Sequence, residues 1–169
     1  ASSGSGYGNG LWSAQPLQQP ADAEFPSSAS AMPAGTIRFD NGALPVRFVS
    51  VHTTSPTAQS WDLWRKSLTE MQQLTARTGT QYVLMGDFNA TYDHAVFRDL
   101  LGSRFQDAAR ASGHGLVFSW PADKPWLPAF SGIDHIVTER GVVVGQVSTM
   151  RIGGSDHRAL LATLDFTRR

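Results

Sequence analysis

The fold is decided by residues 45–89, which run PVRFVSVHTTSPTAQSWDLWRKSLTEMQQLTARTGTQYVLMGDFN. Pro45–His52 and Tyr82–Met85 are apolar runs that predict two strands. Between them, apolar side chains recur at helical spacing, which predicts an amphipathic helix over about residues 58–78, ended by Gly79. A strand, a helix and a strand in this order form a βαβ unit with parallel strands, so their C-terminal ends share one edge of a sheet.

Upstream of this unit, Thr36–Phe39 and Pro45–His52 are predicted to form a hairpin around a turn at residues 40–42, Asp-Asn-Gly. Residues 1–35 are rich in Gly, Ser, Ala and Pro, with one apolar island around Leu11 and Trp12. Two interpretations of them stay open. They are a disordered tail or expression remnant, or they hold a short edge strand at 10–13 followed by a long loop. Residues 36–169 are predicted to be the C-terminal portion of a single domain.

Downstream, short elements precede three more strands. Asp93 is predicted to cap a helix over 94–101, and residues 106–111 and 118–120 to form a turn and a brief strand. The loop 121–132 carries three prolines and is predicted to be irregular. Three consecutive strands then follow over Ile133–Thr138, Val142–Met150 and Ala159–Phe166. If they alternate in direction, the first and third begin at the same edge of the fold.

Composition excludes some classes of function. The 14 basic and 14 acidic residues give a formal net charge of zero, which argues against a strongly electrostatic grip on long duplex DNA. The chain has no cysteine, so disulfides and zinc–thiolate sites are excluded. No apolar run reaches the length of a membrane span.

The motif over residues 86–89, Gly-Asp-Phe-Asn, follows a predicted strand. Gly, Asp and Asn are ordinary turn formers, so one interpretation is a simple turn. The other is functional, because Asp87 can bind or orient a metal-bound water and the Asn89 amide can donate to a phosphoryl oxygen.

A second group of polar residues begins the predicted strands near the C-terminus. Asp156 and His157 follow Gly153 and Gly154 and could belong only to a tight loop. A carboxylate such as Asp134 near an imidazole, however, fixes its tautomer and supports its protonated form. Such an imidazolium can stabilise negative charge or protonate a leaving oxygen. His135 should point to the opposite face of its strand and is interpreted as structural.

Other histidines and several aromatic residues are also candidates. His52 ends a predicted strand and becomes a candidate phosphate donor if it shares an edge with Asp87. Trp120, Trp126 and Phe130 either line a substrate rim or serve as core or interface packing. His94 and His114 are interpreted as solvated polar residues.

Together these motifs resemble the endonuclease/exonuclease/phosphatase superfamily, whose best-known fold is that of deoxyribonuclease I. The matching pieces, in the family's order, are Val51-His52-Thr53, Met85-Gly86-Asp87-Phe88-Asn89-Ala90, Ile133-Asp134-His135-Ile136 and Ser155-Asp156-His157-Arg158-Ala159-Leu160. The resemblance implies an α/β (α+β) fold, a four-layered sandwich with two central sheets, and hydrolysis of phosphate esters with a divalent metal.

The resemblance also implies residue roles. Asp87 would position or activate the attacking water, and His52 and Asn89 would contact the scissile phosphate. His157 would pair with Asp134, while Asp156 and Asp87 would lie at or near the metal. Trp120 is a further candidate for substrate contact.

The sequence departs from the family at its front. Family members carry an active-site Asn and a metal-binding Glu on early strands, whereas Glu24, Glu70 and Glu139 are the chain's three glutamates and none fits that context. The N-terminal part of the fold is therefore expected to be absent from these residues and supplied by a longer chain or another polypeptide. The C-terminal half is similar to membrane-anchored bacterial members, which implies association with a membrane and a domain outside the cytoplasm.

The leading expectation is a Mg²⁺- or Mn²⁺-dependent phosphoesterase in which water attacks phosphorus in line. Nucleic acid, phospholipid and small phosphate esters stay open as substrates. The alternative is a non-catalytic binding or scaffolding module, or an inactive fragment of a larger enzyme.

Overall fold

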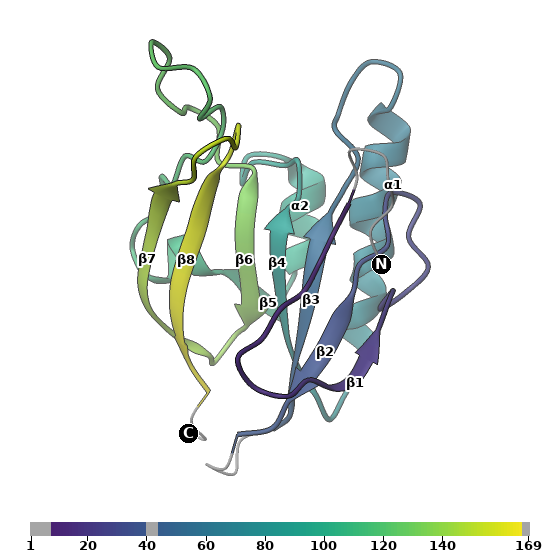
Figure 1. The fold of residues 1–169 in the computed structure, drawn as a ribbon. Coiled ribbons are helices and arrows are strands. Elements are labelled where there is room, and N and C mark those ends of the chain that lie inside the picture. The colour runs from purple at the N-terminus through teal and green to yellow at the C-terminus, as the bar shows by residue number, and fades with distance from the viewer. Residues whose placement is uncertain (1–7, 40–43, 167–169) are drawn as a thin grey trace.

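The structure, a computed structural model, describes residues 8–39 and 44–166 and has a mixed α/β architecture. Its main sheet has six strands in the order β1-β2-β3-β4-β6-β5, and β7 and β8 form a separate two-stranded ribbon (Figure 1). The strands are β1 Gln18–Ala21, β2 Ala34–Ile37, β3 Val46–His52, β4 Gln81–Asp87, β5 Phe105–Asp107, β6 Asp134–Glu139, β7 Val143–Arg151 and β8 Arg158–Asp165. The helices are α1 Trp61–Met71, the 3-10 segment η1 Gln72–Ala76, α2 Ala95–Leu101 and α3 Ala108–Ala111.

The centre of the sheet is the predicted βαβ unit. Strands β3 and β4 are parallel neighbours in unbroken register from Val46 opposite Gln81 to His52 opposite Asp87. The chain crosses between them through α1 and η1, as a parallel pair requires. Strand β6 runs antiparallel on the other side of β4 and pairs Asp134 with Asp87.

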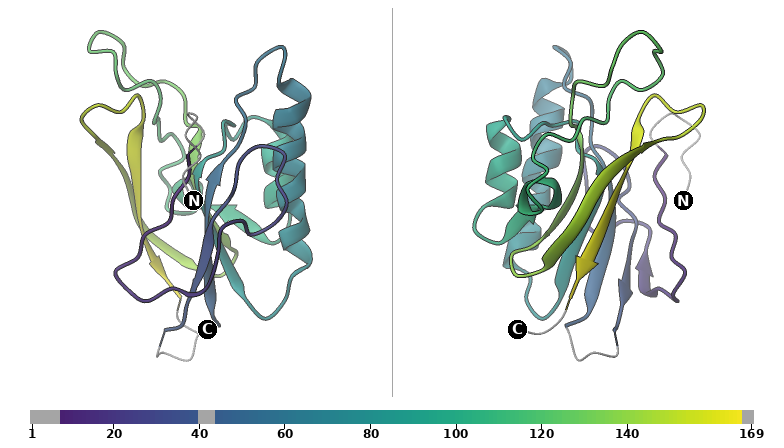
Figure 2. Two further views of the ribbon diagram at one scale, coloured as in Figure 1. Left: turned by 45° about the vertical axis from the view of Figure 1, so that its right-hand side comes forward. Right: turned by 90° about the vertical axis from the view of Figure 1, so that its left-hand side faces the viewer.

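The helices α1 and α2 cover one face of this sheet (Figure 2). On α1 the buried side chains Trp64, Leu68 and Met71 are three to four residues apart, so they form one apolar stripe. They pack with Val49, Leu84 and other core residues of the sheet into the main hydrophobic cluster. This cluster packs the helices onto β3 and β4, whose C-terminal ends are paired directly with each other.

The β7–β8 ribbon lies on the opposite side of the sheet from α1 (Figure 2). It is held by a much smaller cluster, formed by Ala108, Ala109 and Val147 with partly buried neighbours such as Ile136 and Leu160. Ile136 and Asp134 share a face of β6 because they are two residues apart. The ribbon therefore packs on the same face of β6 that carries Asp134.

Several element boundaries differ from the sequence-based predictions. The first strand is Gln18–Ala21, paired with β2, whereas residues 10–13 belong to no strand. The β2–β3 hairpin is present, but its predicted turn at residues 40–42 lies outside the described part of the chain. The long helix is α-helical only to Met71 and continues as a 3-10 turn, so it ends before Gly79.

Other differences concern short elements. Helix α2 has His94 rather than Asp93 at its N-cap position, without a capping bond from the side chain. Residues 105–111 form the strand β5 and the single-turn helix α3, and Asp107 caps α3 by accepting from Arg110 N. The brief strand predicted at 118–120 is a single bridge between Trp120 and Ser131. In the described ranges, no helix combines the length and the hydrophobicity needed to span a bilayer.

Candidate active site

Three polar residues form one row across the neighbouring strands β3, β4 and β6, at the end of the sheet where β3 and β4 finish. His52 is the register partner of Asp87, and Asp87 is the register partner of Asp134. Since register partners on neighbouring strands point to the same face, the three side chains project together on the face that carries the ribbon. The sequence predicted that these residues lie at the same end of the sheet. The strand pairing places their three side chains next to one another.

This row opens into a cleft of about 990 Å³. All seven residues predicted for the site line it: His52, Asp87, Asn89, Trp120, Asp134, Asp156 and His157. Seven others complete the lining: Ser55, Pro56, Thr91, His94, Ser131, Ile133 and Ser155. Trp126 and Phe130, the other two aromatic candidates, do not line this cleft. Trp126 is 76% exposed, and Phe130 packs edge-to-face on Trp120.

The turn that follows β4 has a backbone which few residues can adopt. Gly86 has φ 139°, and a Cβ at this position would overlap the Val51 carbonyl oxygen of β3. Asn89 has φ 48°, in the left-handed region that Asn tolerates better than most residues. The turn is stabilised by hydrogen bonds from Thr53 Oγ1 to Phe88 O (2.6 Å) and from Phe88 N to Ile133 O (3.0 Å).

Within this turn, Asn89 holds the Asp87 carboxylate in place. The Asn89 backbone N–H donates to Asp87 Oδ1 (2.7 Å) and its side-chain Nδ2 donates to Asp87 Oδ2 (3.0 Å). The second Nδ2 proton goes to Thr53 O (3.0 Å), while Ser55 Oγ donates to Asn89 Oδ1 (3.2 Å). Both amide protons are thus engaged, so Asn89 orients Asp87 here and would have to release one bond to reach a phosphoryl oxygen.

On the facing side of the cleft, His157 Nδ1 hydrogen-bonds to Asp134 Oδ2 (2.7 Å). The pair joins the main sheet to the ribbon, because Asp134 begins β6 and His157 immediately precedes β8. Ser119 supports both sides: its Oγ accepts from Asp134 N (3.4 Å) and its carbonyl accepts from Arg158 N (2.8 Å). With Nδ1 engaged, Nε2 is the ring nitrogen that can serve a substrate.

The surroundings push the titratable groups in different directions. Burial, reinforced by the negative charge of Asp134, raises the pKa of Asp87 to about 6. The hydrogen bond to Asp134 raises the pKa of His157, which favours its imidazolium form. Burial and the nearby His157 lower the pKa of His52, so its neutral form is favoured. Its Nε2 lies 3.9 Å from Asp87 Oδ2. A carboxyl group with a raised pKa beside a stabilised imidazolium is an arrangement suited to acid–base chemistry.

The described residues do not form a complete metal site. Across 8–39 and 44–166, no group of three or more Asp, Glu or His side chains is placed to hold a metal ion. All three glutamates are engaged away from the cleft. Glu24 pairs with Arg47 and Arg77, Glu70 accepts from Ser28, and Glu139 pairs with Arg104. Of the three carboxylates that line the cleft, Asp134 is bonded to His157, and Asp87 and Asp156 are the candidate metal ligands.

Some cleft residues were not foreseen. His94 was interpreted as solvated, but it is half-buried, accepts from Thr91 N through Nδ1 (2.9 Å) and meets the Trp64 ring edge-on. Ser55, which lines the cleft, and Ser119, which does not line it but bonds to Asp134 N and Arg158 N, carry no motif of their own. Their only sequence signal is position, since each lies within a few residues of a strand end or motif that the cleft uses.

Comparison with known proteins gives the same assignment. The sequence profile of the Endonuclease/Exonuclease/phosphatase family matches residues 1–157. A search of curated proteins found no match. An endonuclease/exonuclease/phosphatase from Bacteroides vulgatus superposes with a TM-score of 0.65 at 17% identity, covering 89% of this chain and 66% of that one.

Two further solved structures carry more specific names. A mannosyl-6-phosphatase from Bacteroides thetaiotaomicron matches with a TM-score of 0.60 at 17% identity, covering 80% of this chain and 57% of that one. The catalytic domain of APE2 from Xenopus laevis matches with a TM-score of 0.62 at 16% identity, covering 79% and 55%. The chain thus spans little more than half the length of these two structures.

At such low identity the superpositions establish the fold, which is of the deoxyribonuclease-I-like type, and the profile match establishes the family. The profile match over residues 1–157 agrees with the family that the four sequence motifs resemble. The row across the sheet brings residues of three of these motifs together. This chain belongs to the endonuclease/exonuclease/phosphatase family.

Proposed function

We propose that this protein hydrolyses phosphate esters by in-line attack of water on phosphorus. The observation that carries the proposal is the convergence of the row His52–Asp87–Asp134 with His157 in one cleft of about 990 Å³. A phosphate group at this position would meet an imidazolium on one side and a carboxylate with a pKa of about 6 on the other.

In this proposal each side chain has a defined task. Asp87 accepts a proton from the attacking water, and Asn89 holds its carboxylate at the required angle. His157, supported by Asp134, stabilises charge on the phosphoryl oxygens or protonates the leaving oxygen through Nε2. His52 and Trp120 contact the substrate from neighbouring sides of the cleft.

We also propose that the reaction requires Mg²⁺ or Mn²⁺, for which carboxylate oxygens are suitable ligands. A bound cation of this kind neutralises phosphate charge and lowers the pKa of water. Asp87 and Asp156 alone do not make such a site, so at least one further ligand is needed beyond the described residues. We propose that a complementary N-terminal segment of the same fold supplies it, in line with the fraction of each structural neighbour that this chain spans. Membrane association through a longer chain stays a prediction from resemblance.

A second candidate function is a non-catalytic module that binds phosphate groups. The incomplete set of metal ligands among the described residues favours it. The two candidates differ in turnover, since a binding module would retain affinity for inorganic phosphate without releasing product.

A hydrolysis assay distinguishes the candidates. The chain, alone and within any longer parent, is tested on a generic phosphodiester and a phosphomonoester with Mg²⁺, Mn²⁺ or a chelator. Hydrolysis that needs the metal, together with its loss in Asp87→Ala and His157→Ala, is the expected result. Asp62→Ala and His114→Ala are matched controls, because both residues are exposed and neither lines the cleft. Near wild-type rates in both site variants would show that the site is assigned wrongly.

A further inference from the structure

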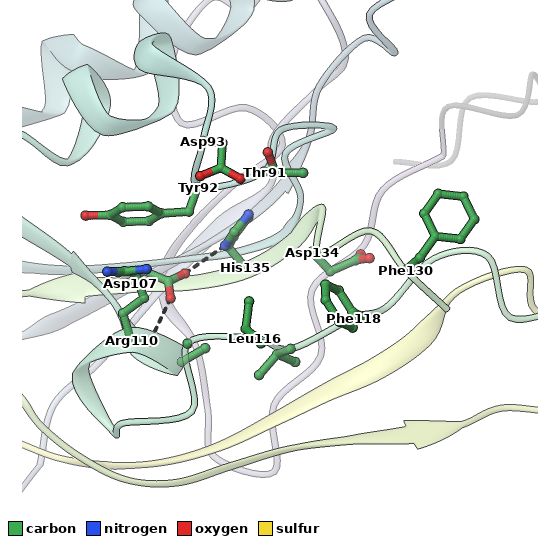
Figure 3. A pocket seen from close by; sticks show the side chains of 14 residues that line it. Thr91, Tyr92, Asp93, Asp107, Arg110, Leu116, Phe118, Phe130, Asp134 and His135 are labelled. Carbon is green, nitrogen blue, oxygen red and sulfur yellow. Dashed lines mark hydrogen bonds and ion pairs between the residues drawn. The ribbon is translucent and has the colours of Figure 1, made fainter. Parts of the chain in front are cut away.

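A buried histidine–carboxylate pair, His135 with Asp107, lies beside Asp134 of the candidate active site (Figure 3). His135 follows Asp134 on β6 and is only 7% exposed. Its Nδ1 lies 2.7 Å from Asp107 Oδ2, and its Nε2 lies 2.7 Å from the carbonyl oxygen of Ala90. Figure 3 shows that Asp134 points away from Asp107, as expected for adjacent residues of a strand.

The partners of His135 determine where its protons lie. The carbonyl oxygen of Ala90 can only accept, so Nε2 must carry a proton. The second hydrogen bond of the ring joins Nδ1 to Asp107 Oδ2. The other oxygen, Asp107 Oδ1, accepts from Arg110 N (3.0 Å). Removal of His135 would leave two buried acceptors, at Asp107 and Ala90, without this donor.

The His135 ring is also fixed by packing. It lies on the Phe97 ring of α2 with centroids 4.2 Å apart, and the Phe88 ring meets it nearly perpendicularly at 5.7 Å. Phe88 belongs to the turn that carries Asp87 and Asn89. A ring with two hydrogen bonds and two aromatic neighbours has one orientation, so it defines where that turn lies.

This matters for the cleft because the turn is strained. Asn89 adopts φ 48°, in the left-handed region that residues other than glycine rarely occupy, and such a conformation persists only where its surroundings determine it. His135 holds the turn from both sides. It pairs in register with Gly86 before the turn and binds the carbonyl of Ala90 after it. The same residue is covalently joined to Asp134.

We propose that His135, held by Asp107, is a positioning residue. It sets the distance between two pairs of cleft residues: Asp87 with Asn89, and Asp134 with His157. The proposal rests on the proposed hydrolysis at this cleft, but it concerns two residues that are not part of the cleft lining. Its specific content is that hydrogen bonds, rather than a buried charge, perform the positioning.

Three variants distinguish positioning by hydrogen bonds from positioning by the charge of Asp107. His135→Phe keeps an aromatic ring beside Phe97 and removes both hydrogen bonds. Asp107→Asn keeps both, because its amide can donate to Nδ1 while its oxygen still caps α3. Glu139→Gln is the matched control, since it weakens the pair with Arg104 at the opposite end of β6, away from the cleft.

In a hydrolysis assay normalised to folded protein, His135→Phe is expected to lower kcat about 10- to 100-fold with KM within about threefold of wild type. Asp107→Asn and Glu139→Gln are expected to stay within about threefold of wild type in both constants. A kcat for His135→Phe equal to that of Glu139→Gln would overturn the proposal, and so would a loss in Asp107→Asn as large as that in His135→Phe. If His135→Phe does not fold, Asp107→Ala takes its place.

A second measurement does not depend on turnover. In amide hydrogen exchange followed by NMR, His135→Phe is expected to speed exchange at Phe88 and Asn89 at least tenfold relative to Glu139→Gln, whereas Asp107→Asn leaves it unchanged. If wild type hydrolyses no ester, the proposed function fails, and this measurement still decides the positioning role. Unchanged exchange in His135→Phe would refute it.

Discussion

At the residue scale, the site depends on a few positions where chemistry and backbone are matched. Asp134 of β6 and His157, the residue before β8, meet at 2.7 Å, and Asn89 takes a left-handed conformation to hold Asp87. These residues were predictable from sequence, because each belongs to a short polar motif at a strand end. The contacts of Ser119 with Asp134 and of Asp107 with His135 were not predictable. Their residues are 15 and 28 positions apart in sequence, and such contacts leave no local pattern.

The first prediction concerns the protonation of His157. NMR titration in the presence of a chelator should give His157 a pKa above its ordinary value of 6.5, because Asp134 stabilises the imidazolium. The folded state then binds this proton more tightly than the unfolded state. The stabilisation is fully present below about pH 6.5 and is lost as the pH rises through the folded pKa. Asp134→Asn should lower the pKa of His157. An unchanged titration in that variant would contradict the pairing.

The second prediction separates a backbone clash from backbone strain. Gly79 and Gly86 both have positive φ, but a Cβ meets the Val51 carbonyl oxygen at Gly86 and no described atom within 4 Å at Gly79. Gly79→Ala should cost about 1–2 kcal/mol in the free energy of unfolding. Gly86→Ala should cost about 3 kcal/mol or more, at the upper end of single substitutions. Urea denaturation measures both, and equal losses would show that β3 and β4 are less closely packed than described.

At the element scale, the strongly periodic segments were predicted correctly and the weak ones were not. The β3–α1–β4 unit and the last three strands, β6 to β8, appear where the apolar patterns placed them, with boundaries shifted by a few residues. The strand β1 was missed because its sequence, Gln-Gln-Pro-Ala, has low strand propensity and pairs only through β2. Tertiary pairing decides such an edge strand, and a single sequence does not contain that information.

The third prediction tests the apolar stripe of α1. Leu68 is fully buried against the sheet, whereas Leu63, on the same helix, is 42% exposed. Leu68→Ala should lower the free energy of unfolding by about 2–5 kcal/mol, because it leaves a cavity in the main core. Leu63→Ala should change it by no more than about 0.5 kcal/mol. Thermal or urea unfolding of the two variants provides the comparison, and similar losses would mean that the helix packs through a different face.

At the scale of the whole molecule, the site lies between two parts of unequal packing. The sheet and its helices share the large cluster that includes Trp64, Leu84 and Phe97, while the ribbon is held by the small one around Ala108 and Val147. The sequence predicted the strands of the ribbon but not that they leave the main sheet. The ribbon packs on Ala108, Ala109 and Ile136, which are distant from β8 in sequence, and local patterns do not show such contacts.

The fourth prediction follows from this difference. Native-state hydrogen exchange should show that amides of β7 and β8 open with a lower free energy than those of β3 and β4. Val147 and Leu160 are suitable probes on the ribbon, and Val49 and Leu84 on the sheet. Equal protection in the two parts would show that the molecule opens as one cooperative unit.

The row of register partners at the sheet edge also determines where the chain tolerates a change of length. A single residue inserted into β4 ahead of Asp87 would turn every later side chain of that strand to the other face and take Asp87 out of the row. The loop 121–130 has no such constraint, since it contains no strand and its tip at Trp126 is exposed. Among relatives, or in a designed variant, insertions and deletions should therefore accumulate in this loop. The strands that align His52, Asp87 and Asp134 should keep their lengths to the residue.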